Sequence, residues 1–251
     1  MFKRFIDIAL SSFGLFLFSP LLVPAIIAIW LQDFRSPFYI ANRVGRGGHL
    51  FRMVKLRTMV VNADKAGIDS TSANDTRITA VGHIVRSWKL DELSQLWNVL
   101  SGDMSLVGPR PNVKSETDRY TDIERSLLNV KPGITDIASI VFSDEGTILS
   151  DSNDPDLDYN RLIRPWKSRL GLLYIEHQNV SLDIALMALT GLTIVSRSTA
   201  LKAIEFLLER LDAPDDLQDI ARRDRDLSPF PPPGAKRPVD ASDLYGERAT
   251  V

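Results

Sequence analysis

The stretch IALSSFGLFLFSPLLVPAIIAIWL, Ile8 to Leu31, is a run of 24 residues without one charged side chain. At about 1.5 Å per residue it makes roughly 36 Å of α-helix, enough to cross a hydrocarbon core of about 30 Å. A cleaved signal peptide has an apolar region of only about 7–15 residues and ends in a small-residue cleavage site. The sequence Trp30-Leu31-Gln32 is not such a site. The run therefore predicts a membrane segment within residues 1–34.

Two prolines and the flanking charges bear on how this segment enters the membrane. Pro20 and Pro24 each remove a backbone donor and kink a helix, and the Ser19 hydroxyl is placed to bond a freed carbonyl. Cations that precede and follow a membrane segment favour the cytoplasm on both sides. A helix that breaks and returns to the same face fits that pattern, and a kinked spanning helix is the alternative. The flanking cations are Lys3, Arg4, Arg35, Arg43, Arg46, Arg52, Lys55 and Arg57.

The composition excludes several classes of protein. The chain has 251 residues, no cysteine, three histidines and a net charge of −2. A disulfide framework, a thiolate zinc site and a cysteine nucleophile are therefore excluded, and a nucleic-acid partner is not expected. Three interpretations are open for the basic segment after the membrane run. It is a solvated face, it binds anionic lipid headgroups, or it binds a phosphorylated substrate.

Downstream of the membrane run, the pattern predicts an α+β fold that is mostly α. Residues 38–41 and 50–59 read as a small β-hairpin around a glycine turn at 45–48. Residues 181–195 and 200–211 are predicted to be apolar helices. Either both lie in the core or, as we favour, one or both are amphipathic and lie on the bilayer surface. Residues 212–251 hold 6 of the 14 prolines and are expected to be disordered.

An adjacent pair of acids, Asp91 and Glu92, lies in the helical pattern of residues 85–100. As one continuous helix, this stretch buries Glu92 on an apolar face, which raises its pKa and suits it to proton transfer. Asp91 then stays ionised near water, where it can attack an electrophile or bind Mg²⁺. If the helix breaks near Lys89, Asp91 becomes the N-cap of a second helix. A structural surface pair of acids remains a third interpretation.

The segment Gly108-Pro109-Arg110-Pro111 presents a cation rigidly. The prolines restrict the backbone on both sides of Arg110, so its guanidinium loses little further entropy on binding a phosphate. The alternative is that Arg110 caps a helix end.

Five blocks together resemble the bacterial sugar transferases, the small monotopic phosphoglycosyl transferases, over about residues 1–210. Three departures are visible: Ser94 stands where proline is common, residues 136–142 replace a Gly-containing polar segment, and Leu173 stands where an acid is common. The blocks are Lys3-Arg4-Phe5-Ile6-Asp7, Lys55-Leu56-Arg57-Thr58-Met59, LDELSQLWNVL at 90–100, GDMSLVGPRP at 102–111 and Lys131-Pro132-Gly133-Ile134-Thr135.

The resemblance implies a reaction at the cytoplasmic face of the bacterial inner membrane. A sugar 1-phosphate passes from a UDP-sugar to undecaprenyl phosphate, with Mg²⁺, through a phosphosugar-aspartyl intermediate on Asp91 and with release of UMP. It implies Glu92 as the acid/base partner and a re-entrant bend at Ser19-Pro20. Mg²⁺, bound at Asp91, and the cations Lys55, Arg57, Arg86 and Arg110 are suited to neutralise the phosphates. Arg57 and Arg86 can instead brace the fold.

The expected organisation is a re-entrant membrane hairpin at 1–34, a catalytic domain at 35–211 and a tail at 212–251. A non-enzymatic membrane adapter that binds anionic lipid is the competing function, and an adapter does not need the acid pair. An open apolar surface would bind either lipid or a second copy of the chain, so a homo-oligomer is one of the two expected partner states. The sequence does not name the sugar.

Overall fold

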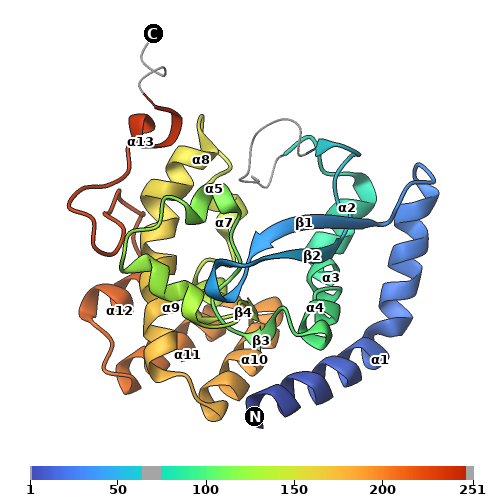
Figure 1. Ribbon diagram of the computed structural model, residues 1–251, viewed down its shortest axis with the longest axis horizontal. Helices are drawn as coiled ribbons and strands as arrows, with labels where there is room; N and C mark the ends of the chain where they lie inside the picture. Colours follow the sequence, from blue (N-terminus) through green and yellow to red (C-terminus); the bar gives the residue numbers. More distant parts are fainter. Residues whose placement is uncertain (1, 64–74, 247–251) are drawn as a thin grey trace. The chain divides into compact units, whose positions relative to one another are not determined.

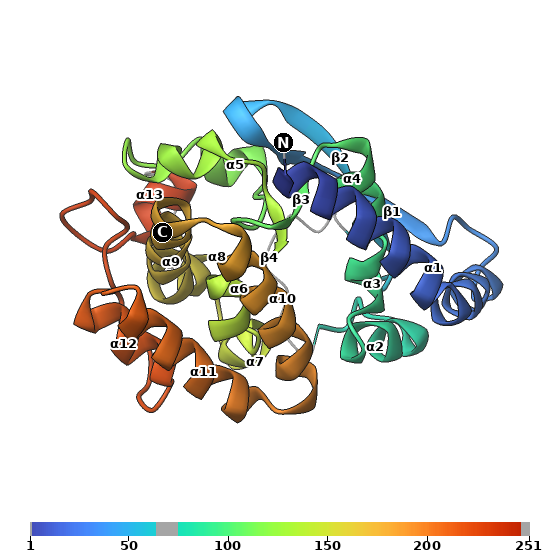
Figure 2. The same ribbon diagram turned by 90° about the horizontal axis from the view of Figure 1, so that it is seen from below.

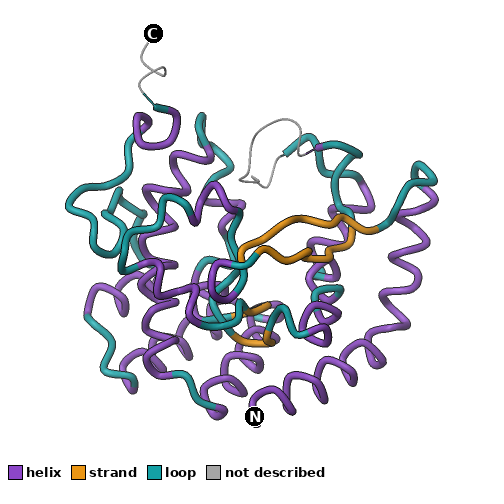
Figure 3. The backbone as a smooth tube through the Cα atoms, in the orientation of Figure 1, coloured by secondary structure: helices purple, strands orange, loops and turns teal. Residues whose placement is uncertain are grey.

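The computed structural model describes residues 2–63 and 75–246. The chain is mostly helical with small sheets, as Figure 3 shows, and it divides into two compact units. The described residues of the first unit are 2–63, 76–118 and 128–134. The second unit contains residues 119–127 and 135–246. This confirms the mostly α fold class with a small sheet.

Helix α1 (Phe2–Leu31) runs through both prolines without interruption and bends along its course (Figure 1). Because Pro20 has no N–H for the Phe16 carbonyl, that acceptor would be left open. The Ser19 hydroxyl donates to it at 2.7 Å, which confirms the expected role of this side chain. By length and composition, α1 is the one helix of the described chain that could cross a membrane, and most of its apolar side chains are exposed, Phe16 by 80%.

The first residues of α1 fasten the helix to the first unit. Lys3 Nζ donates to the Val107 carbonyl at 3.0 Å, and the Arg4 guanidinium donates to the last carbonyls of helix α4 (Leu96–Ser101), those of Val99 and Leu100. The buried Asp7 carboxylate accepts from the Ser105 hydroxyl and the Leu106 N–H. These contacts give the opening Lys-Arg-Phe-Ile-Asp block a structural role.

The second half of α1 packs on the remainder of the first unit. Leu22 and Ile29 form a buried cluster with Leu56 and Val85. Helices α2 (Ala80–Ser87), α3 (Leu90–Leu93) and α4 lie alongside α1, as Figure 2 shows.

The predicted hairpin is confirmed. Strand β1 (Phe38–Val44) pairs antiparallel with β2 (Leu50–Leu56) around the turn η1 (Arg46–Gly48), with Tyr39 opposite Lys55. A second two-stranded sheet joins β3 (Ser105–Val107) to β4 (Gly133–Thr135), at two stretches for which we predicted no strand. A short helix, α5 (Lys114–Thr117), follows β3.

The acid-bearing segment is not one helix. It breaks at Lys89, whose φ of 52° is left-handed and ends α2 before α3 begins. The alternative with a break near Lys89 is therefore correct, but Lys89 is the N-cap and Asp91 lies in the first turn of α3.

The second unit is built of helices around α9 (Arg164–His177). Helix α11 (Arg197–Arg210) buries Leu201, Ile204 and Leu208, so for this helix the core alternative is correct. Helix α10 (Val180–Val195) buries Leu182 and Leu186 and exposes other apolar residues. The other elements are η3 (Glu124–Asn129), α6 (Ile137–Val141), α7 (Glu145–Ile148), α8 (Pro155–Asp158), η4 (Tyr159–Ile163), α12 (Asp215–Arg222) and α13 (Ala241–Tyr245).

Residues 212–246, expected to be disordered, instead pack on the second unit. Leu217 on α12 is buried, and Phe230 stacks on Trp166 with ring centroids 4.3 Å apart. The Tyr245 hydroxyl donates to Asp154 at 2.8 Å. A few apolar and aromatic side chains at suitable positions outweigh the polar average composition of this segment. Residues 247–251 of the predicted tail lie outside the described residues.

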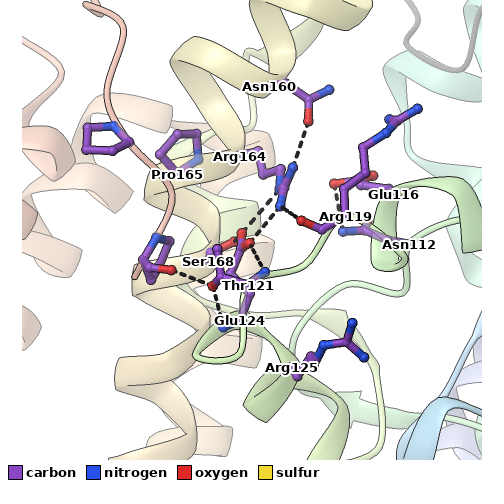
Figure 4. Close-up of polar contacts among 12 residues, drawn as sticks. Asn112, Glu116, Arg119, Thr121, Glu124, Arg125, Asn160, Arg164, Pro165 and Ser168 are labelled. Atoms are coloured by element: carbon purple, nitrogen blue, oxygen red, sulfur yellow. Dashed lines mark hydrogen bonds and ion pairs between the residues drawn. The ribbon is translucent and has the colours of Figure 1, made fainter. Parts of the chain in front are cut away.

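A buried ion pair ties α9 to the 119–127 segment (Figure 4). Glu124 is 0% exposed and Arg164 3% exposed, and Arg164 Nη2 donates to Glu124 Oε2 at 2.6 Å. Ser168 donates to the other carboxylate oxygen at 2.8 Å, and Asn160 accepts from Arg164 Nη1 at 3.0 Å. Both charges are thus hydrogen-bonded as well as paired.

We predict that Glu124→Gln destabilises the protein by about 3–5 kcal/mol, because it leaves the Arg164 charge buried and uncompensated. The double variant Glu124→Met/Arg164→Met removes both charges and should be clearly more stable than Glu124→Gln. Denaturant unfolding in detergent measures both variants. A double variant less stable than the single one would contradict this interpretation.

Candidate active site

The two adjacent acids lie on α3 within reach of cations from three other segments of the first unit. Lys55 comes from β2, Arg86 from α2 and Arg110 from the loop after β3. The charges of all three act on the Asp91 carboxyl. Lys55, Arg86 and Arg110, which we predicted as phosphate-binding residues, are therefore brought together around the acid pair.

Side chains of the acid-bearing segment hold it against the open edge of β2. The Asn98 amide accepts from the Val54 N–H at 2.9 Å and donates to the Arg52 carbonyl at 2.8 Å, so it pairs with the strand as a neighbouring strand would. The Ser94 hydroxyl lies 3.1 Å from the Val54 carbonyl and 2.8 Å from the Asp91 carbonyl. These contacts fix α3 next to Lys55.

Arg110 is positioned by a close crossing of two loops. A Cβ atom on Gly133 would lie 2.1 Å from the Gly108 nitrogen, and one on Gly108 would lie 2.6 Å from the Lys131 carbonyl oxygen. Only glycine fits at either position. The Gly133 N–H also donates to the Pro109 carbonyl at 3.0 Å. The Gly-Pro-Arg-Pro and Lys-Pro-Gly blocks thus form one local structure that presents Arg110.

The Arg110 guanidinium is paired with the Glu92 carboxylate on α3. Burial opposes ionisation of Glu92, but the Arg110 and Lys55 charges and the Arg110 hydrogen bond outweigh it. They lower the pKa of Glu92 to about 2. The sequence-based expectation of a protonated, apolar Glu92 is therefore wrong. A helical projection shows neighbours within the segment and misses an arginine 18 residues further along the chain.

Asp91 has the opposite environment. Burial raises the pKa of Asp91 above its ordinary value, and the nearby Glu92 charge adds to that effect while Lys55 opposes it. In the part of the chain that the structure describes, no hydrogen bond or ion pair engages the Asp91 carboxylate. Its oxygens are available to a ligand, whereas Glu92 Oε1 is bonded to Arg110.

The site carries more positive than negative charge. Burial lowers the pKa of Lys55, and the Arg110 charge lowers it further. Two cations that we did not predict as site residues also act here: Arg43 on Lys55, and Lys89 on Glu92. Both could have been predicted. Arg43 lies on β1, the strand whose Tyr39 is opposite Lys55 in the hairpin, and Lys89 stands two residues before Asp91. Such an excess of cations suits a ligand with several negative charges.

Arg57 lies outside this cluster. Its guanidinium donates to both carboxylate oxygens of Asp33, at 2.7 and 2.6 Å, and to the Ile29 carbonyl at 3.4 Å. It therefore braces the end of α1. Arg86 serves both functions, because Nε donates to the Thr58 hydroxyl at 2.9 Å while its charge acts on Asp91.

The acid pair offers Mg²⁺ one carboxylate that has no protein partner among the described residues. Within residues 2–63 and 75–246, no cluster of three or more acids or histidines could hold a metal ion by itself. Mg²⁺ commonly binds through one or two carboxylates together with substrate phosphates and water. The free Asp91 carboxylate fits that mode, and the paired Glu92 does not.

The family model described as bacterial sugar transferase matches residues 1–197. Undecaprenyl-phosphate galactose phosphotransferase of Salmonella typhimurium is 36% identical over 79% of this chain and 41% of its own length. UDP-glucose:undecaprenyl-phosphate glucose-1-phosphate transferase of Caulobacter vibrioides is 35% identical over 66% of this chain and 64% of its own length. A UDP-N-acetylgalactosamine-undecaprenyl-phosphate N-acetylgalactosaminephosphotransferase of Aeromonas hydrophila is 32% identical over 77% of this chain and 44% of its own length. The chain spans less than half the length of the Salmonella and Aeromonas relatives.

The Glu92–Arg110 pair predicts a pH effect on stability. Because the pKa of Glu92 falls from 4.5 to about 2 on folding, its contribution is present above pH 4.5 and is lost as the pH falls toward 2. We expect this acid-dependent loss to be larger in the wild type than in Arg110→Gln, where only the Lys55 and Lys89 charges still lower the pKa of Glu92. Unfolding free energies measured across this range test it, with Glu92→Gln as the control that cannot titrate. An unchanged pH slope in both variants would refute the assignment.

Proposed function

The chain belongs to the bacterial sugar transferase family, and we propose that it transfers a sugar 1-phosphate from a UDP-sugar to undecaprenyl phosphate, releasing UMP. The observation that carries this proposal is the free Asp91 carboxylate beside Lys55, Arg86 and Arg110, in the same unit as the apolar helix α1. The relatives named above act on undecaprenyl phosphate and nucleotide sugars, which supports the same substrate classes here.

In the proposed mechanism, an Asp91 oxygen attacks the sugar-bearing phosphorus of the donor. A P–O bond to Asp91 forms as the bond between this phosphorus and the bridging oxygen breaks, and UMP leaves with that oxygen. An oxygen of undecaprenyl phosphate then attacks the same phosphorus and displaces the Asp91 carboxylate. Lys55, Arg86 and Arg110 neutralise the phosphate oxygens during both steps, which is the main demand of phosphoryl transfer.

Glu92 has a conditional role in this scheme. In the described structure it is held ionised by Arg110. If Arg110 turns to the donor phosphates, Glu92 loses its partner and its pKa rises, so that it becomes able to exchange a proton. Donor binding would then activate the acid/base partner.

Mg²⁺ would be held by the Asp91 carboxylate together with the donor diphosphate, and it would supply further charge neutralisation. The residues of this chain that assist are Lys55 and Arg110, whose charges already act on the acid pair.

We place the site at the membrane surface, on the cytoplasmic face of the bacterial inner membrane. In addition to the exposed apolar residues of α1, Ile84 on α2 is 62% exposed, Trp88, which follows α2, is 66% exposed, and Trp97 on α4 is 62% exposed. Tryptophan is enriched at membrane–water interfaces. A soluble nucleotide and a lipid-borne phosphate could both reach Asp91 at that height.

The first test is UMP release with UDP-sugars, undecaprenyl phosphate and Mg²⁺. We expect turnover by the wild type and a loss of at least about 10³-fold in Asp91→Asn, because the amide cannot form the intermediate. Asp118→Asn, which changes an exposed acid of the same unit, is the matched control. Equal release from Asp91→Asn and wild type would reject the nucleophile, and no release by the wild type with any nucleotide sugar would favour the adapter.

The proposed topology is a re-entrant α1 with its bend at Ser19-Pro20, supported by the basic flanks and the Ser19 contact to Phe16. The chain has no cysteine, so single cysteines can be labelled without background. In oriented inner-membrane vesicles, Phe2→Cys and Ser36→Cys should both react from the cytoplasmic side with an impermeant maleimide. Labelling from opposite sides would establish a spanning helix instead.

A further inference from the structure

Lys89 occupies the turn between α2 and α3, two residues before Asp91. Its left-handed φ of 52° is uncommon for a residue with a side chain. Its N–H donates to the Arg86 carbonyl at 3.0 Å, and its own carbonyl accepts from the Glu92 N–H at 3.1 Å. The backbone position of this lysine is therefore fixed by the same turn that orients the acid pair.

The Lys89 ammonium is not committed to the fold. Across residues 2–63 and 75–246, it makes no hydrogen bond or ion pair. Among these residues the Lys55 ammonium also makes no hydrogen bond or ion pair, whereas Arg110 is paired with Glu92 and Arg86 is bonded to Thr58. The side chain is half-buried, and its charge reaches Glu92.

The surface around Lys89 is apolar on one side. It directly follows the exposed Trp88, with the exposed Ile84 one turn earlier on α2. Both helices flanking Lys89 pack on α1 through apolar residues, including Val81 and Leu90. Lys55 and Arg110, by contrast, reach the acids from β2 and from the loop after β3. A lysine beside exposed tryptophan is suited to the headgroup layer, where its apolar stem contacts lipid and its ammonium meets phosphate.

We infer that Lys89 binds the phosphate of the acceptor lipid and holds it beside Asp91, while Lys55 and Arg110 serve the nucleotide donor. This inference rests on the proposed function and assigns one residue to one of its two substrates. It follows from three observations: the uncommitted ammonium, its fixed place two residues from Asp91, and the exposed apolar residues next to it. An excess of cations at the site leaves charge for a second phosphate after the donor has bound.

The test compares Lys89→Asn with Lys114→Asn. Asparagine tolerates positive φ, so the turn is kept while the charge is removed. Lys114 is an exposed lysine of the same unit that is paired with Asp118, and its replacement removes the same charge from the surface. Lys89→Gly serves as a second variant that keeps the turn, and thermal unfolding verifies that each variant is folded.

In nanodiscs of neutral phosphatidylcholine, we expect KM for undecaprenyl phosphate to rise about tenfold in Lys89→Asn, the effect of losing about one charge-assisted hydrogen bond. KM for the UDP-sugar should change less than about threefold, and Lys89→Arg should restore most of the acceptor affinity. Lys114→Asn should resemble the wild type.

Three outcomes would overturn this inference while leaving the proposed function intact: wild-type turnover with an unchanged acceptor KM in Lys89→Asn and Lys89→Gly, an equal rise in both KM values, or a rise seen only when phosphatidylglycerol is added to the discs. The last outcome would assign Lys89 to bulk anionic lipid. Absence of UMP release by the wild type would instead remove the proposed function itself, and this inference with it.

Discussion

The ion pair between Glu92 and Arg110 decides which of two neighbouring carboxylates is free to react. Arg110 keeps Glu92 ionised and occupied, whereas Asp91 remains without a partner among the described residues and has a raised pKa. Two acids that are adjacent in sequence therefore differ in chemistry because one cation from a distant loop reaches only one of them closely. The crossing of Gly108 and Gly133 is what sets that cation in place.

The contacts of the first unit hold the apolar helix α1, strand β2 and the acid-bearing segment together. The Lys3, Arg4 and Asp7 contacts fasten the start of α1, and its second half shares a buried cluster with Leu56 and Val85. Asn98 then fastens the acid-bearing segment to the free edge of β2. Apart from the apolar cluster, each of these attachments includes a hydrogen bond from a side chain to a backbone group, so the site depends on a small number of polar residues.

Much of this could be predicted from the sequence. The apolar run, the hairpin, the rigid Arg110 and the cluster of Lys55, Arg86 and Arg110 around the acids follow from local pattern and from the motif blocks. What the sequence could not predict depends on contacts between distant residues. The reversed environments of Asp91 and Glu92, the use of Arg57 as a brace on Asp33, and the burial of α11 are of this kind. The packing of residues 212–246 was missed because average composition conceals single anchors such as Phe230 on Trp166.

The central claim is that Asp91 is the residue that carries the phosphosugar. Intact-protein and peptide mass spectrometry after incubation with a UDP-sugar and Mg²⁺, without any acceptor lipid, tests it most directly. The account predicts a mass increase of one sugar phosphate on the peptide that contains Asp91, which disappears when undecaprenyl phosphate is added. Release of UMP without such an adduct, or an adduct on a different residue, would contradict it.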